Sequence, residues 1–370
     1  MRLKDFEVER YFAKHEFTAK YMLSSSDCDG YGMNYVLNLA SEQEKNSWDN
    51  LKLGYTETIG SEPLRQAISQ HYKTIKSDEI VVSSPGEGNF ILMNILLNAG
   101  DNVICMSPMY QSLYQVAKDL GSSVSFWQPT INNSQWQYNP ADLKKLIQPN
   151  TKLIVINFPH NPTGYSPSIN DYYEIIDIAR QQGITIFSDE MYRFLNHTND
   201  TILPSLCDLY ENGISLWGTA KTFGLAGLRL GWLTSKNKNL LKKIESFKDY
   251  LSICNNAPSE ILATIALNNM ESFVQPNLTK IKNNLQNFEQ FHQRNTHFFD
   301  YLKPNSGSTA FIKLKINETA MNFADRLVAE TGIMLLPSET FEYGTSYARI
   351  GFGRQNMPEV LGIFEKYINQ

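Results

Sequence analysis

Short apolar runs alternate with longer segments of helical periodicity between residues 79 and 234. The runs are Ile80–Ser83, Asn102–Met106, Ser123–Trp127, Leu153–Phe158, Ile184–Ser188, Ile214–Trp217 and Leu230–Thr234. Most of them are too apolar to have a face in water, which is typical of parallel strands covered by helices on both sides. The pattern therefore predicts an α/β domain with a mostly parallel sheet of about seven strands.

After Pro258 the pattern changes to long polar helices and then to separated apolar runs. These runs are Thr309–Leu314, Ile333–Leu336 and Tyr347–Gly351, and a helix is expected after Pro358. At 370 residues the chain is longer than the roughly 250–300 residues that one core supports. We therefore expect a large domain over 50–255 and a smaller α+β domain formed by 1–49 and 256–370, with the N-terminal segment packed on the C-terminal part.

Composition excludes several classes of function. The net charge of -5 and the absence of a long basic run give no field for nucleic acid or an anionic membrane, so a small-molecule partner is expected. The four cysteines, Cys28, Cys105, Cys207 and Cys254, are widely spaced and form no C-x-x-C pair. This spacing favours neither a metal site nor a disulfide framework. Reduced thiols and a charged N-terminus without an apolar signal segment predict a cytoplasmic protein.

The strongest local signal is the segment from Ser215 to Gly231, in which Lys221 follows an apolar strand and precedes a glycine-rich turn. Open α/β sheets bind ligands beyond the carboxyl ends of their strands. A lone lysine is most often a solvated surface charge, but this one lies among small and apolar residues. Desolvation near other cations lowers a lysine pKa and suits the amine to Schiff-base chemistry.

Two other strand ends carry polar groups. One is Asn157–Gly164, which reads N-F-P-H-N-P-T-G, and the other is Asp189–Tyr192, which reads D-E-M-Y. Taken singly, the first could be only a proline-glycine turn and the acid of the second only a helix cap.

Together these three segments resemble the pyridoxal 5′-phosphate (PLP) enzymes of fold type I, in particular the class I/II aminotransferases. The resemblance implies that Lys221 binds PLP as a Schiff base and then moves the proton between Cα and C4′. It also implies that Asp189 hydrogen-bonds the pyridine nitrogen, and that Asn161 and Tyr192 reach the phenolic oxygen.

The phosphate group of PLP needs cations and backbone amides. Gly86, Glu87 and Gly88 lie between a strand and the helical run Phe90–Leu97, so their amides are candidate anion ligands, although a plain strand-helix turn is the alternative. We expect the amides of Glu87 and Gly88 to bind and the Glu87 carboxylate to point elsewhere. Arg229 matches the phosphate-binding arginine of the family.

The chain departs from the family just before the lysine, where Gly218 and Ala220 replace small hydroxyl residues. One of those hydroxyls usually contacts the phosphate. The resemblance therefore does not imply a hydroxyl contact with the phosphate at Gly218.

Other residues are assigned by the same resemblance. Tyr110 matches the aromatic residue that stacks on the cofactor ring. Tyr55 matches a tyrosine that reaches the phosphate of a neighbouring subunit, which implies a homodimer. Arg349 matches the arginine that binds the substrate carboxylate, with Arg354 as the alternative. Asn161 is a further substrate contact. The wall around the substrate side chain is assigned to Ser26, Tyr110 and Asn256.

Fold alone does not select the reaction, because fold type I enzymes run several reactions at Cα. The primary interpretation is transamination from an L-amino acid to a 2-oxo acid. A sharper resemblance to the capreomycidine synthases indicates β-elimination and cyclisation of a hydroxylated basic amino acid instead. The resemblance to the capreomycidine synthases rests on four segments: Leu23–Ser26, Asn157–Gly164, Lys248–Tyr250 and Arg349–Gly353. A C–S β-lyase and a PLP-binding regulator are further alternatives, the latter without an evident DNA-binding segment.

Overall fold

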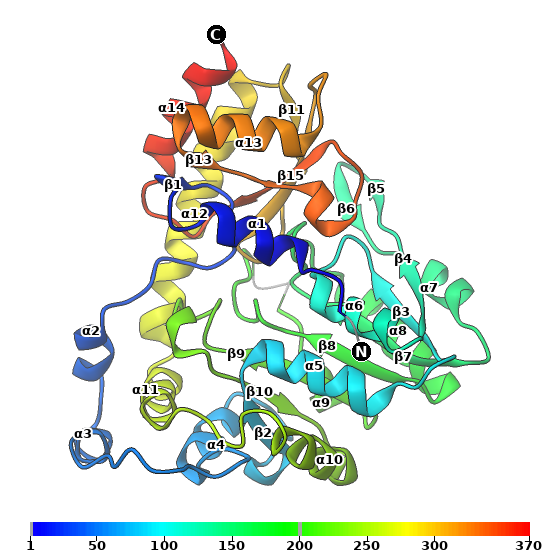
Figure 1. Ribbon diagram of the computed structural model, residues 1–370, viewed down its shortest axis with the longest axis vertical. Coiled ribbons are helices and arrows are strands. Elements are labelled where there is room, and N and C mark those ends of the chain that lie inside the picture. Colours follow the sequence, from blue (N-terminus) through cyan, green and yellow to red (C-terminus); the bar gives the residue numbers. More distant parts are fainter. Residues whose placement is uncertain (1–2, 199–201) are drawn as a thin grey trace.

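A seven-stranded sheet forms the centre of the larger part of the molecule (Figure 1). The computed structural model describes residues 3–198 and 202–370. In order across the sheet, the strands are β2 (Ile80–Ser83), β10 (Gly231–Thr234), β9 (Gly213–Gly218), β8 (Thr185–Asp189), β7 (Thr151–Asn157), β3 (Asn102–Met106) and β4 (Ser123–Trp127). Strand β10 runs antiparallel to both neighbours and the remaining strands are parallel. The predicted α/β class and mostly parallel sheet are thus confirmed.

Helices cover the strands of this sheet because the buried strands leave no face for water. Along the chain they are α4 (Glu62–Ser69), α5 (Pro85–Leu96), α6 (Gln115–Asp119), α7 (Pro140–Leu146), α8 (Ile169–Gln182), α9 (Leu206–Leu209), α10 (Lys238–Lys248) and α11 (Ala257–Asn268). Helix α8 has well-defined ends. The side chain of Ser168 caps its start by accepting from the amide of Asp171, and Gly183 ends it at a φ of 64°.

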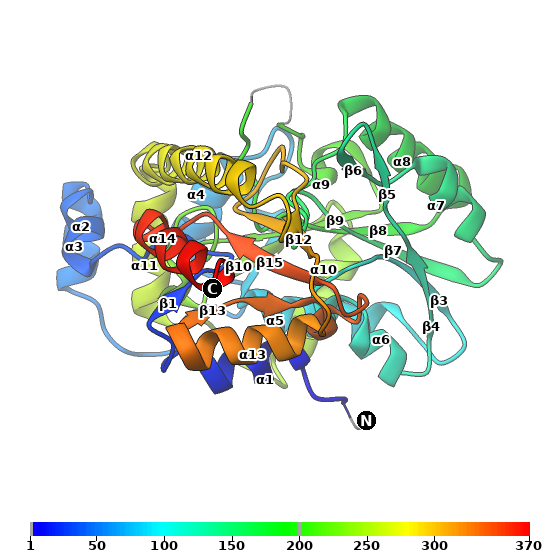
Figure 2. The same cartoon turned by 90° about the horizontal axis from the view of Figure 1, so that it is seen from above.

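The smaller part contains a four-stranded antiparallel sheet. Its order is β11 (Phe299–Asp300), β12 (Thr309–Leu314), β15 (Tyr347–Gly351) and β14 (Leu336–Pro337). The expected single strand Ile333–Leu336 is divided in two, because β13 (Ile333–Met334) pairs with β1 (Tyr21–Met22) whereas β14 pairs with β15. The surrounding helices are α12 (Glu271–Arg294), α13 (Ala320–Thr331) and α14 (Met357–Ile368), and α12 packs beside α14 (Figure 2).

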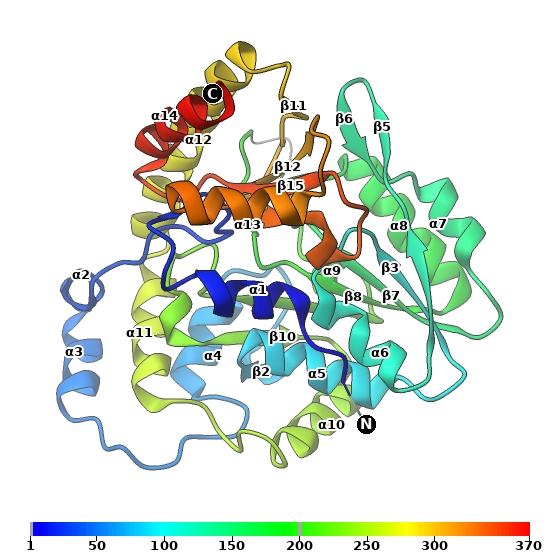
Figure 3. The ribbon, with the colours of Figure 1, turned by 45° about the horizontal axis from the view of Figure 1, so that its top comes forward.

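The N-terminal segment joins both parts of the molecule. Helix α1 (Glu7–His15) lies between them (Figures 1 and 3) and contacts the 3₁₀ turn η5 (Ser338–Phe341). Farther along, α2 (Met33–Asn38) and α3 (Glu42–Asp49) contact α11. The division into 50–255 and 1–49 with 256–370 remains a prediction. In the part of the chain that the structure describes, no helix is long and apolar enough to cross a membrane.

Candidate active site

A cavity of about 500 Å³ lies beyond the carboxyl ends of the central strands. The sequence-predicted residues that line it are Ser26, Gly86, Tyr110, Asn161, Asp189, Tyr192, Lys221, Arg229 and Arg349. Tyr110, Asn161, Asp189 and Lys221 meet because the parallel strands β3, β7, β8 and β9 end at the same edge of the sheet. Ser26 and Arg349 are brought to the cavity by the N-terminal segment and by β15. Four predicted residues, Glu87, Gly88, Tyr55 and Asn256, do not line it.

Lys221 lies three residues after the end of β9 and points toward the N-terminal segment. Its Nζ donates a hydrogen bond of 2.9 Å to Oγ of Ser26. The next residue, Thr222, is held by a different segment, because its Oγ1 donates to the carbonyl of Arg193 at 2.7 Å. The loop that carries the lysine is therefore held by contacts that do not use the lysine itself.

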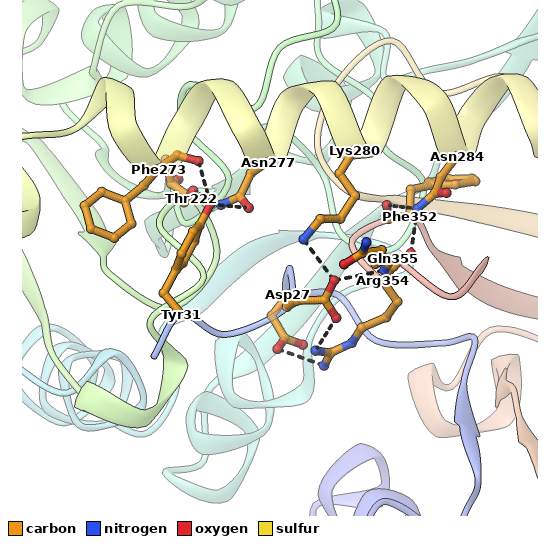
Figure 4. A network of polar contacts seen from close by, with 11 residues as sticks. Asp27, Tyr31, Thr222, Phe273, Asn277, Lys280, Asn284, Phe352, Arg354 and Gln355 are labelled. Carbon is orange, nitrogen blue, oxygen red and sulfur yellow. Dashed lines mark hydrogen bonds and ion pairs between the residues drawn. The ribbon is translucent and has the colours of Figure 1, made fainter. Parts of the chain in front are cut away.

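Helix α12 links this loop to the N-terminal segment (Figure 4). Asn277, Lys280 and Asn284 follow at intervals of three and four and so share one face of the helix. Asn277 Nδ2 donates to the carbonyl of Thr222 at 3.0 Å, and Lys280 Nζ donates to Asp29 Oδ2 at 2.9 Å. Asn284 Nδ2 donates to the carbonyls of Phe352 and Arg354. One rigid element thus positions the loops near Lys221, Ser26 and Arg349.

Asp189 ends strand β8 and is only 8% exposed. Its Oδ1 accepts from the amide of Met191 at 3.0 Å, and burial raises the pKa of its carboxyl from 3.8 to about 7. A desolvated carboxylate at a cavity wall is stabilised by a cationic ligand. Asn157 fixes this end of the sheet, since its Nδ2 donates to the carbonyl of Asp189 and its Oδ1 accepts from the amide of Asn161.

Arg349 lies at the opposite wall, on β15, and is buried. Its Nε donates to the carbonyl of Ser24 and its Nη1 donates to Oδ1 of Asn161, both at 3.0 Å. Burial lowers the pKa of the guanidinium below its usual value. These bonds use Nε and Nη1, so Nη2 can serve a ligand oxygen. Arg354, the alternative, lies outside the cavity and is held by Asp27 at 3.0 Å.

The first turn of α5 differs from the prediction that the amides of Glu87 and Gly88 bind the phosphate. The amide of Glu87 donates to Ser84 Oγ at 3.4 Å, and the amide of Gly88 donates to the carbonyl of Ser84 at 2.9 Å. These amides close the first turn of the helix, and Gly88 packs on Leu216 and Leu233 of the sheet. Gly86 is the residue of this group that faces the cavity. The Glu87 carboxylate points away and accepts from the amide of Ser252 at 3.3 Å.

Arg229 lines the cavity, and among the described residues its guanidinium bonds only within its own turn, where Nη1 donates to the carbonyl of Ala226 at 3.2 Å. Gly218 has a packing role. A Cβ atom at this position would lie 2.9 Å from Cα of Gly231 and 3.0 Å from the carbonyl oxygen of Leu230. The close approach of β9 to β10 therefore excludes a hydroxyl side chain, while Ala220 lines the cavity.

Two other expected residues lie away from the cavity. Tyr55 is 89% exposed, so it can contribute to a site only by contact with another molecule. Asn256 caps α11, where its Oδ1 accepts from the amide of Ser259 at 3.0 Å, so it does not form part of the side-chain wall.

His160, in the same turn as Asn161, is buried and has a structural role. Its Nε2 donates to the carbonyl of Pro108 at 2.8 Å, and its Nδ1 accepts from Oγ1 of Thr163 at 2.7 Å. Burial lowers the pKa of the imidazole to about 3. The ring is therefore neutral and holds the turn that carries Asn161.

Sequence reasoning missed the contribution of helix α1. Val8, Glu9, Phe12 and Glu16 line the cavity from this helix and its C-cap, and the Phe12 ring centroid lies 5.8 Å from Cζ of Arg349. The sequence analysis expected only that the N-terminal segment packs on the C-terminal part, and nothing in the sequence indicates which site it covers. The hydroxyl of Tyr110 donates to the Glu9 carboxylate.

Asn89, on α5, was also missed. It is 3% exposed and lines the cavity. Its Nδ2 donates to Ser112 Oγ at 3.0 Å, whereas among the described residues its Oδ1 has no hydrogen-bond partner. A buried amide oxygen without a donor is costly, so a ligand donor is expected there.

These residues fit PLP group by group. With PLP in the cavity, Lys221 would supply the amine and buried Asp189 a partner for the pyridine nitrogen. Arg229 would supply a cation for the phosphate, and Tyr110 an aromatic ring at the wall. An amine, a buried acid, a cation and an aromatic ring around one cavity are typical of a ligand-binding site and not of a packing defect in a hydrophobic core.

Comparison with known proteins agrees with this geometry. The profile of the aminotransferase class I and II family matches residues 19–362. An aspartate aminotransferase of Sulfurisphaera tokodaii is 30% identical over 337 residues, which cover 84% of this chain and 81% of that enzyme. A capreomycidine synthase of Streptomyces vinaceus is 26% identical over 353 residues, covering 95% of this chain and 88% of the relative.

Solved structures share the fold. A PLP-dependent aminotransferase from Streptococcus suis superposes with a TM-score of 0.92 and 28% identity, covering 100% of this chain and 98% of the other. The PLP-dependent cyclase OrfR gives a TM-score of 0.91 at 21% identity, covering 100% and 97%, which supports the fold alone. The profile match and the site together show that this chain belongs to the class I and II aminotransferases and is a PLP-dependent enzyme.

Proposed function

We propose that the chain transfers an amino group from an L-amino acid to a 2-oxo acid, with Lys221 as the residue that binds PLP and moves the proton. The observation that carries this assignment is the meeting of Lys221, Asp189 and Arg349 in one cavity. An amine, a buried acid and a carboxylate-binding arginine are the groups that transamination requires around its cofactor.

PLP, when bound, supplies an electron sink for the charge that develops at Cα. The chain supplies the remaining functions. Lys221 would remove and return the proton, because its amine is a base in the lining of the cavity. Asp189 would hold a proton on the pyridine nitrogen, and Tyr192 and Asn161 would bind the phenolic oxygen. Arg229 and the amide of Gly86 bind the phosphate.

Arg349 orients the substrate. A carboxylate bound by its guanidinium would be fixed at two points, which aligns Cα with Lys221. Asn161 supports this orientation because its Oδ1 accepts from Nη1 of Arg349 at 3.0 Å. The buried position of Arg349 strengthens the contact by excluding water.

β-Elimination with cyclisation is the second candidate. Similarity to a capreomycidine synthase extends over 95% of this chain, which supports a related reaction on a hydroxylated amino acid. A C–S lyase would use the same residues up to proton removal. The reactions then differ in the fate of the substituent at Cβ.

We further propose a homodimer. Leu53, Tyr55 and Tyr250 are 84%, 89% and 90% exposed, and they lie on segments joined by the bond from Lys248 Nζ to the carbonyl of Thr58. Large apolar side chains gathered on one surface favour association. A cytoplasmic location is also proposed, and it is supported by four widely spaced cysteines that form no disulfide with one another.

A spectral assay tests the function. The PLP-loaded protein is scanned with each L-amino acid, with and without 2-oxoglutarate or pyruvate, and released ammonia is measured. Loss of the visible absorbance that an added 2-oxo acid restores, without ammonia, is expected for transamination. Ammonia release without need for a 2-oxo acid would establish elimination instead. Lys221→Ala should lose the response entirely, whereas the exposed control Lys242→Ala should retain it.

A further inference from the structure

A second cavity, of about 360 Å³, lies between a β-hairpin of the larger part and the four-stranded sheet of the smaller part. The hairpin is formed by β5 (Thr130–Asn132) and β6 (Gln135–Gln137). Asn133 and Ser134, with φ of 48° and 58°, make the tight two-residue turn between them. This hairpin cavity shares no lining residue with the active site, so it is a separate space.

Aromatic rings form much of the lining of the hairpin cavity. Trp136 comes from the hairpin and is 4% exposed, and its ring centroid lies 6.0 Å from that of Tyr347 on β15. The ring of Tyr347 stacks on that of Phe311 at 5.1 Å and 15°. Tyr301 adds a fourth ring. Such walls favour a flat apolar ligand, because aromatic rings gain from stacking as well as from burial.

Two buried polar atoms of the same lining lack partners. Nε1 of Trp136 and the hydroxyl of Tyr301 have no hydrogen-bond partner in the described part of the chain. An indole N–H can only donate, and a buried donor without an acceptor is costly. Both atoms belong to residues that line one cavity, so its ligand is expected to bring acceptor oxygens.

The charges of the lining favour an anion. Lys313 of β12 lies directly opposite Tyr347 in the antiparallel pair, so both side chains project from one face of the sheet. Among the described residues Lys313 has no ion pair, whereas the acid of the lining, Asp300, is paired with Lys315 at 2.6 Å. Burial lowers the pKa of His292, so this ring is neutral at pH 7. The uncompensated charge beside the cavity is therefore positive.

We propose that the hairpin cavity is a second binding site, and that it takes a small aromatic carboxylate. The ring of the ligand would lie among the aromatic walls, and its carboxylate would meet Lys313 and the buried donors. The volume of the cavity falls within the range of about 300–1,000 Å³ that is usual for small-molecule sites. This inference goes beyond the proposed function and does not depend on which reaction the active site performs.

The hairpin cavity borders the strand that carries the proposed carboxylate-binding arginine. Phe311 lies directly opposite Arg349 in the pair of β12 with β15. The ring of Phe341 lies 5.8 Å from the Phe311 ring and 5.8 Å from Cζ of Arg349. A test must therefore separate binding in the hairpin cavity from binding of the same carboxylate at Arg349.

Isothermal titration calorimetry of the PLP-loaded protein tests the site with three probes. Phenylacetate has both the ring and the charge, phenylacetamide keeps the ring without the charge, and cyclohexylacetate keeps the charge without the flat ring. Phenylacetate should bind with a Kd of about 1 mM or lower. Each of the other two probes should bind at least about threefold more weakly, because each lacks one of the two interactions.

Variants then locate the bound probe. Lys313→Gln and Tyr301→Phe should each weaken phenylacetate by about threefold or more, and Lys313→Gln should not change the affinity for phenylacetamide. Lys366→Gln is the matched control, because this exposed lysine of the smaller part lies outside the lining. In Arg349→Lys, where the active-site contact is weakened, phenylacetate should still bind the hairpin cavity with unchanged affinity.

Absence of phenylacetate binding would overturn the inference, as would an equal affinity for phenylacetamide. Wild-type affinity in both Lys313→Gln and Tyr301→Phe would also overturn it. Binding that is lost in Arg349→Lys but retained in those two variants would place the probe in the active site instead. None of these outcomes bears on transamination, which the spectral assay tests separately.

Discussion

The amine of Lys221 donates a hydrogen bond of 2.9 Å to the hydroxyl of Ser26, a residue 195 positions earlier in the chain. Ser26 is itself fixed, because its carbonyl accepts from Oγ of Ser308 at 2.6 Å. The N-terminal segment therefore supplies a partner for the residue that we propose to bind PLP and to move the proton.

Ser26→Ala should lower kcat by about threefold to tenfold, since the amine loses one hydrogen bond that orients it. Retention of PLP should not change, because the cofactor keeps its contacts to Asp189 and Arg229. Steady-state kinetics and absorbance after dialysis measure both quantities. Ser24→Ala is the matched control, because the buried Oγ of Ser24 has no hydrogen-bond partner in the described part of the chain. Equal effects of the two variants would contradict the role of Ser26.

Arg349→Lys should raise KM for every amino acid substrate by about tenfold or more. The ammonium keeps the charge but loses the planar fork, a contact worth roughly 1.5–3 kcal/mol. Initial-rate measurements over a range of amino acid concentrations test this. Arg326→Lys, on the surface beside Glu318, should leave KM unchanged. A normal KM in Arg349→Lys would move the carboxylate site elsewhere.

The stability of the protein without PLP should depend on pH through Asp189. Its pKa is raised from 3.8 to about 7 in the folded chain, so the folded state holds a proton that the unfolded state releases. Stability is therefore greatest below pH 3.8 as far as this group is concerned, and it falls as pH rises toward 7, by about 2–4 kcal/mol.

Denaturant unfolding at pH 5 and pH 8 measures this effect. Asp189→Asn should flatten the dependence because the amide does not ionise, and bound PLP should reduce it by placing a cation beside the carboxylate. The same pH slope in wild type and variant, both without PLP, would exclude this assignment.

Gly218→Ala should destabilise the protein by about 1–3 kcal/mol, because its Cβ would meet the backbone of Gly231 and Leu230 within 3.0 Å. Gly227→Ala is the control, since a Cβ there meets no atom within 4 Å. Thermal unfolding compares the two. Equal stability of the variants would mean that β9 and β10 can separate without cost, and that packing does not explain the missing hydroxyl.

The protein should sediment as a dimer at micromolar concentration. Leu53→Glu combined with Tyr250→Glu should shift it toward monomer, because charge would replace exposed apolar surface. If Tyr55 reaches the partner's phosphate, Tyr55→Phe should weaken PLP retention without dissociating the dimer. Ile131→Glu changes another exposed apolar residue and should alter neither property. A monomeric wild type with full activity would contradict the proposal.

The sequence predicted the central sheet closely because buried parallel strands have a strong apolar signature. The predicted runs Ile80–Ser83 and Asn102–Met106 coincide with β2 and β3. It was less accurate for Ile333–Leu336, because this run pairs with two different strands, and one of them, β1, lies far away in the chain. The hydrophobic pattern within one run does not show which strands the run pairs with.

The sequence alone determined the fold class, the family resemblance and a set of candidate residues led by Lys221. These follow from local patterns, since each motif needs particular residue types at a strand end. Only the tertiary structure decided that the amide of Gly88 closes a helix turn, that Gly218 is required by strand packing, and that α1 places Glu9 and Glu16 on the cavity. The first depends on the residue at which helix α5 begins, and the other two depend on contacts between separate segments of the chain. Hydrophobic periodicity encodes neither.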